Sequence, residues 1–308
     1  MKKDFLAIAD FTPEEIRNIL DLAINLKKEY FASGNIPFLQ NKVLAMIFSK
    51  PSLRTRISFD MAMRQLGGDA LFISPDEIGL GKRESIADVA RVLSGYVSAI
   101  MARVFEHQQV LELAKWANIP VINGLSDYNH PCQAMADMLT IYEHFGTLKG
   151  LKVTFLGDGN NVAVSLMHAC SKLGMNFCIA SPDGYDLVPK AITLAKEISK
   201  QSGGKMQFLR DPIEAVKNAD VVYSDTWTSM GQEAETKKRE IIFPPYQVNS
   251  NIMSYAKPKA IFMHCLPAHR GQEVTDDVAD GPQSVIFQQA HNRLHAQKAI
   301  LVKLLMED

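Results

Sequence analysis

The sequence predicts an α/β protein of two domains, each with a mostly parallel sheet flanked by helices on both faces. Short apolar runs of strand length alternate with helical segments along most of the chain. This alternation is typical of parallel sheets whose strands are connected by helices. The length of 308 residues also suits two domains, because one domain commonly has about 100–200 residues.

The individual elements follow from local residue patterns. Thr12–Glu15 is a capping box with proline at the first helical position, and apolar residues at helical spacing follow it. Val43–Phe48 is a continuous apolar run, which is typical of a strand buried on both faces. Further strands are expected at Ala70–Ile73, Ala99–Ala102, Pro120–Asn123, Val153–Leu156, Phe177–Ala180, Val221–Ser224, Ala260–His264 and Val285–Phe287.

The domain boundary is expected near Gly146–Gly150, where a Met- and Leu-rich helix ends and a new strand begins. This divides the chain into domains at 1–148 and 149–289, with a terminal helix at about 290–308 expected to pack back on the first domain. The charged stretch Ser229–Tyr246 contains Gly231, Pro244 and Pro245. It is predicted to be a long loop with at most one turn of helix, and such loops often serve as lids.

Composition excludes several classes of function. Apolar residues make up 47% of the chain and charged residues 22%, and the net charge is -1. This balance gives no reason to expect nucleic acid or an anionic membrane as a partner, and no run approaches the ~20 apolar residues of a membrane span. The four cysteines are far apart and lack zinc-ligand spacing. We therefore expect no metal, no disulfide, no signal peptide and a cytoplasmic location.

The first polar motif, Ser52-Leu53-Arg54-Thr55-Arg56, follows the buried strand and opens a helix. Backbone N–H groups at a helix start bind anions, and arginine matches phosphate oxygens with its planar fork. An ordinary N-cap serine with two solvated arginines is the alternative. The position outside the carboxyl end of a strand, where open sheets bind ligands, favours a phosphate site.

A second motif, His130-Pro131-Cys132-Gln133, also begins a helix, and its histidine and glutamine lie on one helical face. These two side chains could bond the carbonyl and amino groups of an amide-like substrate. A cap with a satisfied histidine is the alternative. Arg103 follows another predicted strand and could reach a carbonyl or a phosphate, although a lone arginine is often only a surface residue.

The second half of the chain offers groups suited to an amino acid. Gly157–Val162 resembles a dinucleotide fingerprint, but Val162 occupies the third glycine position, which makes nucleotide binding unfavourable. Asn160 and Asn161 at this helix start could hold a carboxylate, and Asp225 at a strand end could bind an ammonium. Cys265 also follows a strand, and no histidine–asparagine pair at protease-like spacing marks it as a covalent nucleophile.

Together these segments resemble the aspartate/ornithine carbamoyltransferase family over nearly the whole chain. Ser-x-Arg-Thr-Arg and His-Pro-x-Gln are shared across the family, whereas Asp-x-Trp-x-Ser-Met-Gly from Asp225 and His-Cys-Leu-Pro from His264 mark its ornithine branch. The resemblance implies the reaction of carbamoyl phosphate with L-ornithine to give L-citrulline and phosphate, without a cofactor. It also implies a homotrimer or a higher assembly of trimers.

The resemblance assigns a role to each motif residue. Those expected to hold carbamoyl phosphate are Ser52, Leu53, Arg54, Thr55, Arg103, His130, Gln133, Cys265, Leu266 and Arg293. Those expected to hold ornithine are Asn161, Asp225, Ser229 and Met230. Arg103, His130 and Cys265 are the expected catalytic residues.

Two positions depart from the family pattern. Leu53 replaces the common threonine, which is tolerable if only its N–H is used, and Gly79 replaces a frequent glutamine. The Gly79–Glu84 segment resembles one that reaches a neighbouring subunit's site. The alternatives are a carbamoyltransferase acting on putrescine, acetylornithine or aspartate, a non-catalytic paralogue, and a nucleotide-dependent dehydrogenase.

Overall fold

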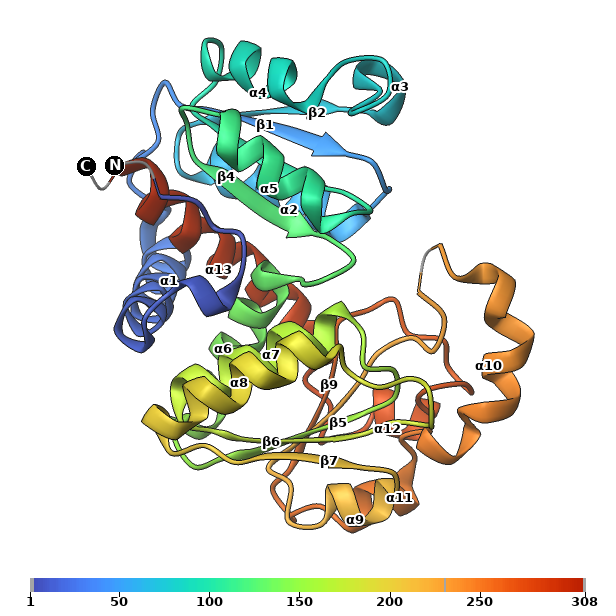
Figure 1. Cartoon of the computed structure of the whole chain (residues 1–308). Coiled ribbons are helices and arrows are strands. Elements are labelled where there is room, and N and C mark those ends of the chain that lie inside the picture. Colours follow the sequence, from blue (N-terminus) through green and yellow to red (C-terminus); the bar gives the residue numbers. More distant parts are fainter. Residues whose placement is uncertain (1–2, 230, 307–308) are drawn as a thin grey trace. The chain divides into compact units, whose positions relative to one another are not determined.

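A computed structural model describes residues 3–229 and 231–306. The chain forms two compact units, each with its own sheet (Figure 1). Unit 1 comprises Met1–Leu139 and His291–Asp308, and unit 2 comprises Thr140–Ala290. The boundaries fall inside two helices, α6 (Pro131–Phe145) and α13 (Ile286–Met306).

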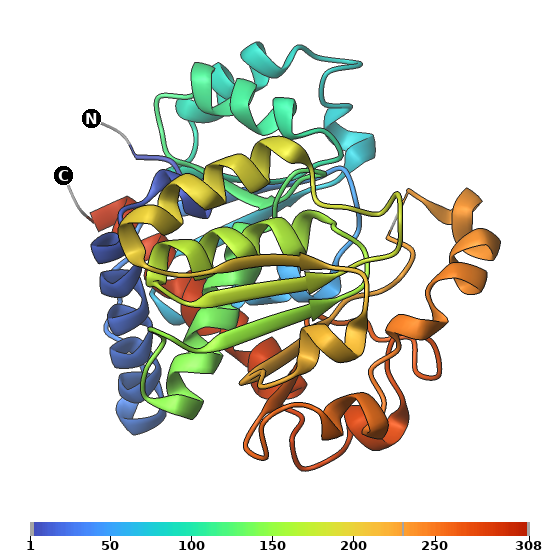
Figure 2. The same ribbon diagram turned by 60° about the horizontal axis from the view of Figure 1, so that its bottom comes forward.

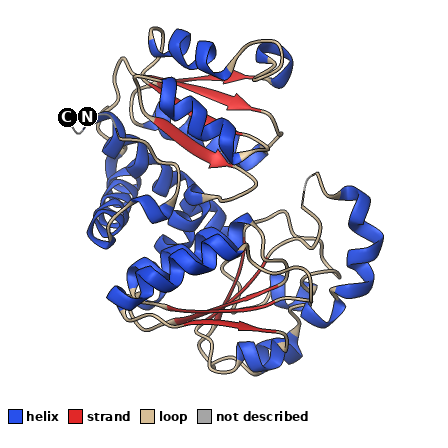
Figure 3. Ribbon diagram, in the orientation of Figure 1, coloured by secondary structure: helices blue, strands red, loops and turns tan. Residues whose placement is uncertain are grey.

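Unit 1 contains a four-stranded parallel sheet in the order β2-β1-β3-β4. Figure 3 draws the strands in red and the helices in blue. The strands are β1 (Val43–Phe48), β2 (Asp69–Ile73), β3 (Ala99–Arg103) and β4 (Val121–Leu125). From β1 the chain passes through α2 (Leu53–Gln65) to β2 on one side of β1. Strands β3 and β4, which follow α4 (Ile86–Ser94) and α5 (His107–Trp116), lie on the other side of β1. Because such crossovers are right-handed, α2 covers one face, and α4 and α5 cover the other.

The remaining helices of unit 1 include η1 (Ile8–Asp10), α1 (Pro13–Ser33) and α3 (Pro75–Ile78). The predicted capping box at the start of α1 is present, since the N–H of Glu15 donates to Thr12 Oγ1 at 3.1 Å and the N–H of Thr12 donates to Glu15 Oε2 at 2.8 Å. Helix α1 lies beside α13 (Figure 1), and Lys27 Nζ donates to Asn292 Oδ1 at 2.8 Å across this contact.

Unit 2 contains a five-stranded parallel sheet in the order β7-β6-β5-β8-β9, whose first three strands are the yellow-green to gold arrows of Figure 2. The strands are β5 (Lys152–Leu156), β6 (Asn176–Ala180), β7 (Met206–Leu209), β8 (Val221–Ser224) and β9 (Ile261–His264). Helices α7 (Asn161–Leu173) and α8 (Pro189–Ser202) cover one face, and α9 (Pro212–Val216) and α11 (Ser250–Ser254) cover the other (Figure 1). The predicted fold class is thus confirmed.

Each sheet has one point where the strand order reverses, and ligands bind outside the carboxyl ends of the strands at such points. In unit 1 the reversal lies between β1 and β3, and in unit 2 it lies between β5 and β8. The motifs opening at Ser52 and Gly157, together with Arg103 and Asp225, all lie at these two places.

Three local predictions were wrong. Val285–Phe287 is not a strand, because its backbone makes only a short bridge to Phe262 before α13 begins. Strand β7 was missed, since it is a short and half-buried edge strand. Ser229–Tyr246 is not a mostly irregular loop: it contains η2 (Glu233–Glu235), α10 (Thr236–Ile242) and η3 (Pro244–Tyr246).

Within the described residues, none of the helices combines the length and apolarity that a membrane crossing requires. The last short helix, α12 (Asp276–Ala279), lies in unit 2.

Candidate active site

The first group of predicted residues comes together in unit 1. We call it the anion cluster, and it consists of Ser52, Arg54, Thr55, Arg103, His130, Gln133 and Arg293. Ser52 is the N-cap of α2, and its Oγ accepts the Thr55 N–H at 3.2 Å. The positive end of a 13-residue helix therefore points toward the space beyond β1.

Arg293 links two motifs that lie far apart in the sequence. Its Nη1 donates to Gln133 Oε1 at 2.8 Å, and its Nη2 donates to Thr55 Oγ1 at 3.3 Å. All three side chains are buried. The other end of the Gln133 amide donates to Asp137 Oδ1 at 2.8 Å. Protein groups therefore engage both ends of the glutamine and fix its orientation beside the arginine.

Arg103 and His130 add a cation and a neutral donor to this cluster. Arg103 ends β3 in register with Phe48, the last residue of β1, and it is buried. Burial, with the nearby charges of Arg293, Arg103 and Arg54, holds the pKa of His130 well below its ordinary value. The imidazole is therefore neutral at pH 7, and it can donate one hydrogen bond without adding a charge.

The backbone leading to His130 is held by buried amides. Asn123 Nδ2 donates to the Leu6 carbonyl at 3.1 Å and also to Asn129 Oδ1, and Cys132 Sγ donates to the Asn123 carbonyl at 3.4 Å. Burial raises the pKa of Cys132 to about 12. Cys132 is therefore a packing residue within the His-Pro-Cys-Gln motif, and the reactive groups there are its neighbours.

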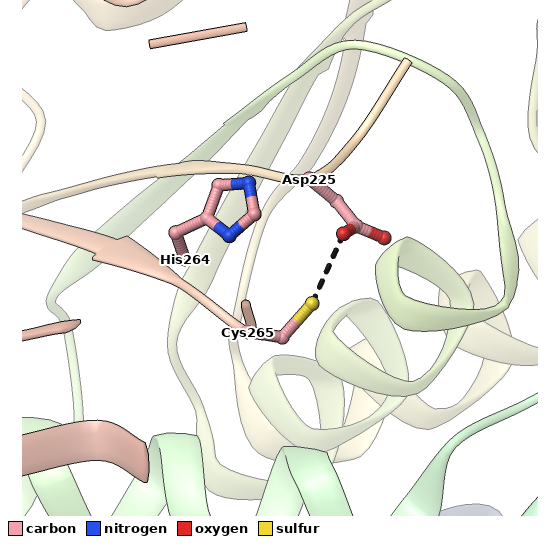
Figure 4. A group of neighbouring side chains, drawn as sticks. All are labelled: Asp225, His264 and Cys265. Atoms are coloured by element: carbon pink, nitrogen blue, oxygen red, sulfur yellow. Dashed lines mark hydrogen bonds between the residues drawn. The ribbon is translucent and has the colours of Figure 1, made fainter. Parts of the chain in front are cut away.

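The second group comes together in unit 2. We call it the amino-acid cluster, and it consists of Asn160, Asp225 and Cys265, which are bonded to one another, and of their chain neighbours Asn161 and Leu266. Asp225 is its centre: its Oδ1 accepts the Cys265 thiol at 3.0 Å and the Thr226 N–H at 2.8 Å, and its Oδ2 accepts Asn160 Nδ2 at 2.8 Å. Figure 4 shows the thiol of Cys265 directed at this carboxylate.

Asn160, which was expected with Asn161 to hold a carboxylate, caps α7. Its Oδ1 accepts the N–H groups of Val162 and Ala163, which leaves its Nδ2 to bond Asp225. Asn161 is the first residue of α7 and is half-buried. The predicted carboxylate site at this helix start thus has two neighbouring amide side chains, of which that of Asn160 is bonded to Asp225 and to the first turn of α7.

The turn after β9 is shaped by His264 and Glu273, both fully buried. His264 Nδ1 accepts the Leu266 N–H at 2.9 Å, and its Nε2 lies 3.2 Å from Glu273 Oε1. The bond from the Leu266 N–H to His264 Nδ1 accompanies a φ of 58° at Leu266, a left-handed conformation that is unfavourable for leucine. The ligand atoms of Asp225, His264 and Cys265 lie within 4.8 Å of one another. Because both ring nitrogens of His264 already face protein groups, this set does not offer the imidazole that a zinc site would need.

A buried ion pair fixes the segment that follows Ser229. Arg239 of α10 donates to Asp158 Oδ2 and to the Trp227 carbonyl, each at 2.6 Å. Its guanidinium also lies 4.8 Å from the centre of the Tyr185 ring. Ser229 itself is half-buried. Met230, which was also predicted to hold ornithine, lies outside the described residues.

Leu53 is a predicted site residue whose side chain takes no part in the anion cluster. This side chain is 74% exposed, so only the Leu53 backbone is available to the cluster. Residues that sequence reasoning missed are Asp137, Glu273 and Arg239. None of them stands in a recognisable motif, so no signal in the sequence marked them.

Comparison with known proteins identifies the family. The model of the carbamoyl-P binding domain of aspartate/ornithine carbamoyltransferases matches residues 3–143, and that of the Asp/Orn binding domain matches residues 149–304. The chain belongs to the aspartate/ornithine carbamoyltransferase family. The anion cluster lies in the first matched segment except for Arg293, and the amino-acid cluster lies in the second.

Similar proteins agree over the full length. An ornithine carbamoyltransferase of Pyrococcus abyssi is 55% identical over 98% of this chain and 96% of its own. An anabolic ornithine carbamoyltransferase of Pyrococcus furiosus is 54% identical over the same shares. The solved structure of an ornithine carbamoyltransferase from Pyrococcus furiosus matches with a TM-score of 0.97 and 54% identity, covering 100% of this chain and 98% of that one. This chain is thus a carbamoyltransferase in family and in fold.

Proposed function

We propose that the protein is an ornithine carbamoyltransferase, which converts carbamoyl phosphate and L-ornithine into L-citrulline and phosphate. The observation that carries the proposal is Asp225, a buried carboxylate bonded by Cys265 and Asn160 at the carboxyl end of β8. A carboxylate in this place suits the ammonium of a free amino acid. The 54–55% identical relatives that bear the name ornithine carbamoyltransferase support it.

In this proposal the anion cluster holds carbamoyl phosphate. Arg54 and the start of α2, through Ser52, Leu53 N–H and Thr55, bind the phosphate, since cations and helix N–H groups match its oxygens. Arg103, neutral His130 and Gln133 bond the carbamoyl group. Arg293 adds a buried cation between Gln133 and Thr55. Residues 1–148 form the carbamoyl phosphate domain, to which the terminal helix belongs.

The amino-acid cluster, in residues 149–289, holds ornithine. Asn161, Asp225, Ser229 and Met230 bind its α-amino and carboxylate groups. Cys265 and Leu266 border its side chain and the carbamoyl carbon. The free δ-amine is protonated at pH 7, with a pKa of about 10.4 expected for such an amine. The site must therefore bind the neutral amine or remove its proton before attack.

The reaction then needs only groups of the protein and its substrates. The lone pair of the δ-nitrogen forms a bond to the carbamoyl carbon, and charge gathers on the carbonyl oxygen. Thr55, Arg103 and His130 stabilise that oxygen. The carbonyl re-forms as the bond from carbon to the phosphate oxygen breaks, and phosphate leaves with the electron pair near Arg54. The proton of the attacking nitrogen passes to that phosphate, which gives citrulline and hydrogen phosphate. No cofactor is invoked in this scheme.

Assembly, direction and location are further parts of the proposal. Leu53, Ile57 and Met61 lie at successive i, i+4 positions of α2 with 74%, 49% and 37% of their surface exposed, which supports association of identical chains as a homotrimer or a higher assembly of trimers. The anabolic relative supports a role in arginine biosynthesis. The four free thiols support the cytoplasm.

The deciding experiment offers purified protein carbamoyl phosphate with an amine panel of ornithine, putrescine, acetylornithine and aspartate. Citrulline should form, with kcat/KM for ornithine far above that for the other amines. Faster conversion of another amine would assign the protein to that substrate. Binding of carbamoyl phosphate without turnover of any amine would indicate a non-catalytic paralogue. Light scattering of the same preparation measures the assembly.

A further inference from the structure

A buried glutamine of α13 joins two strands of unit 2. Gln289 is fully buried, and its Oε1 accepts the N–H of His264, the last residue of β9, at 2.9 Å. Its Nε2 donates to the hydroxyl of Tyr223 on the neighbouring strand β8, also at 2.9 Å. One side-chain amide thus connects the carboxyl ends of both strands.

The outer edge of β9 explains why a side chain is needed there. β9 is the edge strand of its sheet. At Phe262 this outer edge is paired with the backbone of the segment that precedes α13. The Phe262 N–H donates to the Gln283 carbonyl, and the Val285 N–H donates to the Phe262 carbonyl. The chain then turns into α13, and the next outward N–H of the strand is that of His264. Gln289 provides the acceptor that the backbone no longer provides.

The Tyr223 end of this link is rigid. Tyr223 is fully buried, and its ring stacks on Phe155 of β5 with centroids 5.5 Å apart and an interplanar angle of 19°. Tyr223 stands two residues before Asp225, and His264 stands one residue before Cys265. The amide therefore holds together the two chain segments from which the Asp225–Cys265 contact of 3.0 Å emerges.

We propose that Gln289 is a positioning residue for the ornithine-binding half of the reaction: it fixes the spacing of Asp225 and Cys265 without touching substrate. The proposal rests on the proposed function for its kinetic test. It predicts that loss of the Gln289 amide weakens ornithine handling and leaves carbamoyl phosphate handling intact.

The test variant is Gln289→Met, which keeps the length of the side chain and removes both hydrogen-bonding groups. The matched control is Gln283→Met: Gln283 Nε2 donates to the Ala260 carbonyl at 2.9 Å, before the first residue of the same strand. Gln289→Met should raise KM for ornithine about tenfold, as expected for the loss of one or two net hydrogen bonds. In Gln289→Met the KM for carbamoyl phosphate should stay within about twofold of wild type. In Gln283→Met the KM values for ornithine and for carbamoyl phosphate should both stay within about twofold.

A conservative variant separates positioning from packing. In Gln289→Glu a carboxylate accepts both from His264 N–H and from the Tyr223 hydroxyl, so both links remain. It should bring KM for ornithine to within about threefold of wild type. Thermal unfolding is measured for all variants, and Gln289→Met is expected to lose more stability than Gln283→Met, because Gln289 is fully buried and makes two bonds whereas Gln283 is half-buried and makes one. A KM for ornithine that followed the loss of stability across the three variants, and not the presence of the two links, would overturn the proposal.

Thiol labelling gives a readout that needs no turnover. Cys265 is half-buried, whereas the other three cysteines are buried, and burial raises the pKa of Cys178 to about 11. Iodoacetamide should therefore label Cys265 first. Labelling should be several-fold faster in Gln289→Met, because the thiol is held less firmly by Asp225, and unchanged in Gln283→Met.

The outcomes distinguish the two proposals. Wild type that forms no citrulline refutes the proposed function, and labelling still decides the positioning role. Active wild type with unchanged ornithine KM and labelling in Gln289→Met refutes the role of Gln289 alone. If Gln289→Met does not fold, Tyr223→Phe takes its place. It removes the hydroxyl that accepts from the amide and keeps the ring, so a several-fold rise in ornithine KM supports the proposal and an unchanged value overturns it.

Discussion

Replacement of Arg239 by methionine is expected to destabilise unit 2 and to weaken ornithine binding. Arg239 donates to Asp158 Oδ2 and to the Trp227 carbonyl, each at 2.6 Å. The side chains of Arg239 and Asp158 are only 4% and 11% exposed. Methionine keeps the apolar stem of the arginine but leaves the carboxylate without its charged partner.

The size of the effect follows from this burial. Removal of one partner of a buried ion pair costs about 3–5 kcal/mol, because the other charge stays desolvated. The additional pair of Arg239 with the half-exposed Glu235 adds little. Burial already raises the pKa of Asp158 despite the lowering effect of Arg239, and the variant should raise it further. The folded variant then binds more protons than its unfolded state, so its stability falls as pH rises. The difference from wild type should be larger at pH 8 than at pH 5.

Urea unfolding at both pH values measures this difference. Asp158→Asn and the double variant complete a cycle that isolates the pair. Arg64→Met is the control, because Arg64 pairs with Asp60 at 2.7 Å on the exposed surface of α2 and should contribute less than about 0.5 kcal/mol. KM for ornithine should rise in Arg239→Met, since Asp158 precedes Asn160, which bonds Asp225. A cost below about 1 kcal/mol, or single effects that simply add in the double variant, would contradict the reasoning.

Three other variants test single residues. Arg54→Ala should lower kcat/KM at least about 100-fold by removing a phosphate contact, whereas Arg64→Ala on the same helix should not; full activity of Arg54→Ala would remove it from the phosphate site. Cys265→Ser should raise KM for ornithine about tenfold and change KM for carbamoyl phosphate less, and full activity would exclude a role for the thiol. Burial lowers the pKa of Lys298 from 10.5 to about 8, so between these values the unfolded chain binds more protons at this side chain, and its contribution to stability should rise with pH. The buried thiols Cys132 and Cys178 act in the opposite direction in both proteins, so the free energy of unfolding of wild type should increase relative to that of Lys298→Met between about pH 7 and 9.5 in urea, and an unchanged difference would contradict the assignment.

The sequence could predict the sheets and the composition of both clusters because parallel strands impose a shared geometry. Their carboxyl ends meet at one edge of the sheet, so polar residues that follow different strands become neighbours. Arg103 and the Ser52 motif meet in this way, since Arg103 is in register with the end of β1. Asp225 and Cys265 meet in the same way at the ends of β8 and β9.

What the sequence could not predict depends on contacts between distant segments. Arg239 lies in a run of charged residues that favours a solvated surface, and its burial becomes visible only with Asp158 beside it. The same contact gives α10 a place to pack, which is why an expected loop is a helix. The Val285–Phe287 run was ambiguous because three apolar residues fit a strand or the start of a helix equally well.

Helix α13 shows why the anion cluster cannot be understood from one matched domain alone. Gln289 and Arg293 are four residues apart and therefore lie on the same face of this helix. Gln289 holds the strand ends that carry Asp225 and Cys265, and Arg293 bonds Gln133 and Thr55 in the anion cluster. Arg293 belongs by sequence to the segment matched as the Asp/Orn binding domain, yet its contacts lie in unit 1. One turn of a single helix thus supplies a buried residue to each half of the reaction, which gives a physical reason for the chain to return to unit 1 after completing unit 2.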